Sequence, residues 1–90
     1  MQKVHAIFHG KVQGVFFRAN CQEKAVSLRI SGWVRNRPDG TVEMKAEGYK
    51  EKLQEMVEWC RNSQPYARVD DIDLNWSTGE PEFNGFRILR

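Results

Sequence analysis

The residues best suited to chemistry in this chain lie in one short stretch, Gly10 to Arg18. Two glycines, Gly10 and Gly14, precede a helical pattern that begins at Phe17. Glycine lets backbone N–H groups turn inward, and consecutive inward N–H groups form a nest that holds an anion. The N-terminus of the helix adds unpaired donors, and Arg18 adds a planar fork that matches two phosphate or carboxylate oxygens. The stretch therefore predicts a cradle for a small phosphate-like anion.

The same stretch could also be only a structural connection. A glycine loop before a helix is often only a tight connection, and an arginine in a first helical turn is often solvated. The stretch is not a Walker A loop, because it ends in Phe16-Phe17-Arg18 rather than Gly-Lys-Ser/Thr. It is not a dinucleotide fingerprint either, because the three-glycine spacing is absent.

Two stretches of the chain resemble the two signatures of the acylphosphatase family. Gly10-x-Val12-Gln13-Gly14-Val15-x-Phe17-Arg18 resembles the first, and Gly32-Trp33-Val34-Arg35-Asn36-x-x-x-Gly40-x-Val42, closing with Gly48, resembles the second. Both match without a gap, and the resemblance spans essentially the whole chain. Position 16 is Phe where many relatives carry Gly, although Phe is also a familiar variant there.

The resemblance implies a role for each candidate site residue. It implies that Arg18 and the loop backbone bind the phosphate, and that Asn36 orients the attacking water; these two are the expected catalytic residues. The expected substrate-binding residues are Gly10, Lys11, Val12, Gln13, Gly14, Val15 and Phe16. Phe17 is expected to pack inward while Phe16 lines the mouth of the site. The family also suggests that the C-terminal end, with the carboxylate of Arg90, lies near Arg18.

The residue types also restrict the reaction. No Ser–His or Cys–His pair is evident, and no carboxylate cluster suggests a metal, so the substrate must already be reactive and no metal or cofactor is expected. An acyl phosphate fits, because its leaving carboxylate has a conjugate acid of pKa about 4. The protein then has to hold the phosphoryl group and aim a water in line, and inorganic phosphate should inhibit as product. Asn36 suits the water because an amide donates and accepts at once, although it could instead only cap a turn.

Two rival functions fit a small domain of this kind. An RNA-binding sheet needs aromatic side chains on its open face, whereas the strand from 40 to 49 exposes Thr41, Glu43, Lys45 and Glu47. Trp33 alone is not a stacking platform, so no nucleic-acid partner is expected. The alternative that stays open is a non-catalytic, anion-binding regulatory module, which would need the cradle but not Asn36.

Hydrophobic periodicity predicts the elements that position these residues. Val4, Ala6 and Phe8 alternate toward a core in a first strand. A break in parity at Asp70-Asp71 predicts a bulge. The expected strands cover 3–9, 32–37, 40–49 and 67–76, with a short strand around 86–88. The expected helices cover 17–29 and 50–62, and Gly32 can stop the first of them. This order predicts an α+β, ferredoxin-like βαββαβ sandwich, with two helices on one face of an antiparallel sheet.

Composition describes one ordinary domain over residues 1–90. The chain is 40% hydrophobic and 29% charged with a net charge of +2, which is too weak a charge to argue for nucleic acid or membrane. No apolar run approaches the roughly 20 residues of a membrane span, and no signal-peptide core is visible. We expect a monomer in the cytoplasm. Cys21 and Cys60 lie on core-facing helix stripes; reduced thiols are expected, with a bond between the helices as the alternative.

Overall fold

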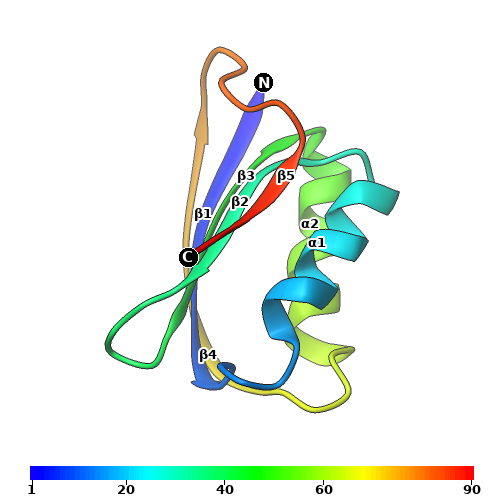
Figure 1. Ribbon diagram of the computed structural model, residues 1–90. Coiled ribbons are helices and arrows are strands. Elements are labelled where there is room, and N and C mark those ends of the chain that lie inside the picture. The colour runs from blue at the N-terminus through cyan, green and yellow to red at the C-terminus, as the bar shows by residue number, and fades with distance from the viewer.

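A computed structural model describes all residues from 1 to 90, and in it two helices cover one face of a five-stranded sheet (Figure 1). The elements are β1 (Gln2–Lys11), α1 (Phe17–Ser27), β2 (Ser31–Asn36), β3 (Val42–Gly48), α2 (Lys50–Asn62), β4 (Arg68–Thr78) and β5 (Phe86–Leu89). The strands lie in the order β4-β1-β3-β2-β5. The predicted ferredoxin-like fold is therefore confirmed.

The last strand departs from the predicted antiparallel sheet. The four strands β1 to β4 pair antiparallel, but β5 pairs parallel with the free edge of β2. The loop after β4 returns the chain to the opposite edge of the sheet, so β5 runs in the same direction as β2. The sheet is therefore mixed, and this parallel edge lies beside α1 (Figure 1).

The core lies between the helices and the covered face of the sheet. Val4, Ala6 and Phe8 are fully buried there, as the alternation in the first strand predicts. Phe17, the first residue of α1, packs its ring edge-on against Phe8, with the ring centroids 5.1 Å apart. Burial of Phe17 confirms its predicted inward direction and anchors the helix start that carries Arg18.

The first strand is longer than predicted and takes in two expected loop residues. Gly10 and Lys11 pair with β4, and the register shifts between His9 and Gly10 because Asp70 is an extra residue on β4. The predicted bulge is thus confirmed. Gly10 has a φ of 126°, and a Cβ there would lie 2.2 Å from the backbone oxygen of Arg68. Gly10 therefore allows close strand pairing, and the loop itself begins after Lys11.

The first helix ends earlier than predicted, and Gly32 does not stop it. The helix ends at Ser27, and Arg29 takes a left-handed φ of 57°. The N–H of Ile30 donates back to the carbonyl of Ala25 at 2.9 Å, which closes the helix end. Gly32 lies inside β2, where a Cβ would meet the backbone oxygen of Lys45 at 2.0 Å.

Glu47 and Thr41 were expected on the open face, but the structure buries both. Glu47 is only 2% exposed because the loop after β4 folds over it. Its carboxylate accepts hydrogen bonds from the backbone N–H groups of Glu82 and Phe83 at 3.0–3.1 Å, and Lys3 lies 3.3 Å away. The predicted alternation along β3 is therefore correct, but the loop after β4 covers the open face of the sheet at the Glu47 end of this strand.

The two cysteines face each other across the two helices. Cys21 and Cys60 are free and buried, with 3.4 Å between their sulfur atoms. The expected reduced thiols are present. Neither helix is long and apolar enough to cross a membrane.

Candidate active site

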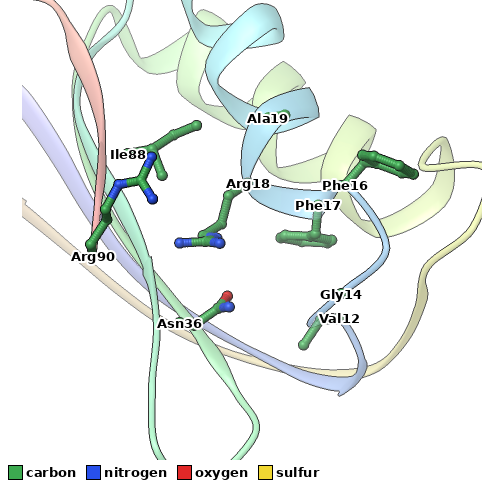
Figure 2. A pocket seen from close by; sticks show the side chains of 9 residues that line it. All are labelled: Val12, Gly14, Phe16, Phe17, Arg18, Ala19, Asn36, Ile88 and Arg90. Carbon is green, nitrogen blue, oxygen red and sulfur yellow. The ribbon is translucent and has the colours of Figure 1, made fainter.

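A pocket of about 360 Å³ opens beside the N-terminus of α1 (Figure 2). Arg18 enters it from the first turn of α1, and Asn36 enters it from the last position of β2. Its lining residues are Val12, Gly14, Phe16, Phe17, Arg18, Ala19, Asn36, Ile88 and Arg90. The pocket therefore brings together the two residues expected to be catalytic, from segments 18 positions apart in sequence.

The loop before α1 offers a row of unused donors to this pocket. Gly14 and Phe16 both take left-handed conformations, with φ of 72° and 63°. No backbone N–H from Gln13 to Ala19 donates a hydrogen bond within the protein, and no side chain caps the helix. Unpaired N–H groups at a helix N-terminus, together with the positive end of the helix dipole, favour an anion. This is the electrostatic feature that the glycine spacing predicts.

Arg18 has most of its donors free. Its Nη1 donates to the carbonyl oxygen of Leu89 at 3.3 Å, and no carboxylate forms an ion pair with it. The guanidinium thus contacts the backbone of the last strand, and the C-terminal end of the chain lies near Arg18 as the resemblance implies. One bond at the edge leaves the planar fork available to an oxyanion in the pocket.

Asn36 carries an unpaired acceptor. Its Oδ1 is buried and has no hydrogen-bond partner. A buried polar atom without a partner costs about 1–3 kcal/mol, so it needs an explanation. Figure 2 shows the Asn36 amide facing the guanidinium of Arg18 across the pocket. A water there would satisfy the oxygen and would stand next to the anion-binding groups.

Gln13 holds the two halves of the site together without lining the pocket. Its Nε2 donates to the carbonyl oxygens of Arg37 and Thr41, both at 2.8 Å. These carbonyls belong to the turn between β2 and β3, immediately after Asn36. Gln13 therefore ties the loop to the strand end that carries Asn36.

Asp39 fastens that same turn from within. Its carboxylate accepts from the hydroxyl of Thr41 at 2.6 Å and from the backbone N–H of Thr41 at 3.0 Å. These two hydrogen bonds lower the pKa of Asp39 below its usual value, and the bond from the Thr41 hydroxyl has the larger effect. The turn that follows Asn36 is thus closed by its own side chains and by Gln13.

The remaining predicted site residues lie outside the pocket. Gly10 and Lys11 belong to β1, and Val15 is half-buried and packs against the core. Conversely, Ala19, Ile88 and Arg90 line the pocket but were not among the expected site residues. Local sequence patterns carry no signal for Ile88, because its place depends on β5 pairing with β2, whereas the family resemblance did place the C-terminal end with Arg90 near Arg18. No group of three or more His, Cys, Asp or Glu side chains could hold a metal.

Comparison with known proteins identifies the family of this chain. The acylphosphatase family model matches residues 4–88. The chain is 44% identical over 90 residues to an acylphosphatase of Methylococcus capsulatus, covering 100% of this chain and 98% of that one. It is 46% identical over 90 residues to an acylphosphatase of Pyrobaculum aerophilum, covering 99% and 95% of the two chains.

Solved structures agree over the whole chain. The crystal structure of the acylphosphatase from Bacillus subtilis superposes with a TM-score of 0.95 and 39% identity, covering 100% of both chains. The structure of an acylphosphatase from Coxiella burnetii gives a TM-score of 0.90 and 34% identity, covering 98% and 92% of the two chains. This chain, with its two matched signatures and its anion cradle beside Asn36, belongs to the acylphosphatase family.

Proposed function

We propose that this protein hydrolyses acyl phosphates to a carboxylate and inorganic phosphate without a metal, with Arg18 and Asn36 as its catalytic residues. The observation that carries the proposal is the unpaired, buried Oδ1 of Asn36 beside a set of unused N–H donors. A cradle alone would serve a module that only binds anions. An acceptor for a water beside the cradle is what hydrolysis requires.

The phosphoryl group binds where donors converge. Backbone N–H groups between Gln13 and Ala19 and the guanidinium of Arg18 hold its oxygens and spread the charge that develops on them. Val12, Gly14 and Phe16 form the wall of this part of the pocket. Gly10 and Lys11, and the side chains of Gln13 and Val15, act at a distance, by holding the loop to the sheet, the β2–β3 turn and the core.

The water is then held by Asn36. The water donates one hydrogen to Oδ1 of Asn36, and the water oxygen accepts a hydrogen bond from the amide nitrogen of Asn36. The water oxygen keeps a second lone pair, with which it attacks phosphorus. The bond between the water oxygen and phosphorus forms as the bond between phosphorus and the acyl oxygen breaks. The electron pair leaves on the carboxylate, and a proton of the water passes to a phosphate oxygen. No strong general acid is needed, because the leaving carboxylate is a weak base.

We also propose that the protein acts as a monomer in a reducing compartment such as the cytoplasm. The buried thiols of Cys21 and Cys60 are adjacent but unbonded, which suits a reducing environment.

Hydrolysis of benzoyl phosphate in excess EDTA tests the activity. We expect turnover that chelator does not reduce, competitive inhibition by millimolar inorganic phosphate, and poor hydrolysis of phosphate monoesters. Arg18→Lys should lose most of the activity, because an ammonium cannot reproduce the planar fork. Phosphate binding without any turnover would instead show a regulatory anion-binding module, and activity restored only by a divalent cation would contradict the metal-free mechanism.

A further inference from the structure

The pocket has more room than the phosphoryl group needs. A water takes up about 30 Å³ in the liquid, so a phosphoryl group and one water fill only part of a pocket of about 360 Å³. Figure 2 shows the two ends of this space, with Val12 and Gly14 on one side of Arg18 and Ile88 and Arg90 on the other. A phosphoryl group held at the loop leaves the β5 end for the acyl group.

Strand alternation brings Arg90 to this end. Side chains two positions apart on an extended chain point to the same face, and Ile88 faces the helices and packs against the core. Arg90 follows with the same parity just beyond β5 and lines the pocket with Ile88. Arg87 has the opposite parity and lies beside Trp33 in the pairing of β5 with β2.

The charged side chains at this end of the pocket are basic, and neither forms an ion pair with another side chain. No Asp or Glu lines the pocket, and its only charged side chains are Arg18 and Arg90. Arg90 makes no ion pair and its side chain makes no hydrogen bond within the protein, unlike Arg35, whose Nε lies 2.6 Å from Glu43. Once Arg18 is neutralised by the phosphoryl group, the Arg90 guanidinium is a free, forked cation at the acyl end.

We propose, on the basis of the proposed hydrolysis, that Arg90 selects acyl phosphates whose acyl group carries a second negative charge, such as a carboxylate, at its far end. The apolar surface of Ile88 and Ala19 would contact the carbon skeleton, and Arg90 would pair with the terminal anion. Dicarboxylic acyl phosphates and phosphorylated carboxyl groups next to acidic groups belong to this class. A neutral acyl group of equal size would gain the apolar contact only.

A matched pair of substrates tests this proposal. In 4-carboxybenzoyl phosphate the carboxylate points away from the reacting bond and cannot attack it, and 4-carbamoylbenzoyl phosphate is its neutral isostere. The measurement is the ratio of kcat/KM for the two substrates. For the wild-type protein we expect the carboxylate to be preferred by about 2- to 5-fold, which is what an exposed charge pair supplies. The preference should appear in KM and should vanish in 1 M salt, where the screening length is about 3 Å.

Variants assign the preference to one side chain. Arg90→Gln should bring the ratio to about one, and Arg90→Lys should keep part of it because the charge remains. Arg87→Gln is the matched control, because it removes the same charge three positions earlier, from the opposite face of β5. It should leave the ratio unchanged.

The possible failures can be told apart. Equal kcat/KM values for the two substrates in the wild-type protein would overturn the role of Arg90, as would an Arg90→Gln variant that keeps the preference, or an Arg87→Gln variant that loses it. In all three cases hydrolysis itself would still stand. Failure of the wild-type protein to hydrolyse unsubstituted benzoyl phosphate would overturn the proposed function and, with it, this inference.

Discussion

At the scale of single residues, Asn36 is the position where binding and catalysis can be separated. In the proposed mechanism the loop N–H groups and Arg18 hold phosphate without Asn36, whose Oδ1 has no hydrogen-bond partner in the protein. An interaction made mainly in the transition state lowers kcat and kcat/KM together. Binding of phosphate should therefore survive a change that removes the water.

Asn36→Ala should lower kcat by about 100-fold or more, since a misplaced nucleophile carries a cost of that order. The inhibition constant for inorganic phosphate should change little. The measurement pairs turnover with phosphate inhibition on protein shown to be folded by circular dichroism. Asn75→Ala, on an exposed position of β4, is the control and should behave as wild type. Unchanged turnover in Asn36→Ala would remove this residue from the mechanism.

Phe16 carries backbone strain at the mouth of the pocket. Its φ is 63° although it has a Cβ, and its side chain is 72% exposed, so packing gives little in return. A left-handed conformation costs a residue other than glycine about 1 kcal/mol or more.

Phe16→Gly should stabilise the protein by about 1 kcal/mol, which raises Tm by about 4–8 °C in a domain of this size. Phe16→Ala is the comparison, because it removes the ring but keeps the Cβ that conflicts with φ. Phe16→Ala should therefore not raise the Tm measured by thermal unfolding. If both variants shift Tm equally, loss of the exposed ring rather than relief of strain is the cause.

At the scale of elements, the loop after β4 is held to the sheet by one carboxylate. Burial works to raise the pKa of Glu47, but hydrogen bonds from the backbone of Phe83 and Glu82 and the charge of Lys3 outweigh it. The pKa of Glu47 therefore lies below its usual value of 4.5. This loop leads directly into β5, which brings Ile88 and Arg90 to the pocket.

A group whose pKa is lower in the folded state stabilises the protein above its unfolded pKa, and that contribution is lost as pH falls through the folded value. The wild-type protein should thus lose stability as pH falls below about 4.5, the ordinary value for a glutamate. Glu47→Gln should be less stable at pH 7 by about 1–3 kcal/mol, since the two N–H groups lose a charged acceptor.

Urea unfolding at several pH values checks this prediction. The difference in the free energy of unfolding between wild type and Glu47→Gln should shrink as the solution is acidified from pH 6 to pH 3. A difference that stays constant with pH would show that Glu47 is not ionised in the folded protein. Glu51→Gln, on the exposed surface of α2, is the control and should leave the pH dependence unchanged.

At the scale of the whole molecule, the two thiols report on the integrity of the core. Burial raises the pKa of the Cys21 thiol well above its usual value, and the contact with Cys60 raises it further. Gln64 packs against the two thiols from one side, because its Nε2 lies 3.3 Å from the sulfur of Cys21 and 3.3 Å from the carbonyl oxygen of Phe17. A thiol reagent can reach either sulfur only when the helices separate from the sheet.

Both cysteines should therefore react with a thiol reagent at one common rate, set by global opening rather than by local fluctuation. Inorganic phosphate should slow that rate, because a ligand of the folded state stabilises it by mass action. The measurement is the rate of labelling at Cys21 and Cys60 by mass spectrometry, with and without phosphate. Rapid labelling of Cys21 alone in folded protein would contradict this, and would make it a candidate nucleophile.

Much of the fold and the centre of the site could be predicted because they depend on neighbouring residues. Alternation in β1 and β3 and the apolar stripes of the helices set which side chains face the core, since their periods are local properties of the backbone. The glycine spacing likewise predicts free N–H donors before α1. Arg18 and Asn36 were identified from two signatures, and the structure brings both into one pocket.

Tertiary structure alone decided the parts that depend on distant pairing. The burial of Glu47 needs a loop 35 positions later in the chain, and the bonds of Gln13 reach across 24 and 28 positions. Ile88 and Arg90 reach the pocket only because β5 pairs parallel with β2 rather than extending β4. Local propensities carry no information on such contacts, because the pairing that buries most surface and satisfies most backbone groups is a property of the whole chain.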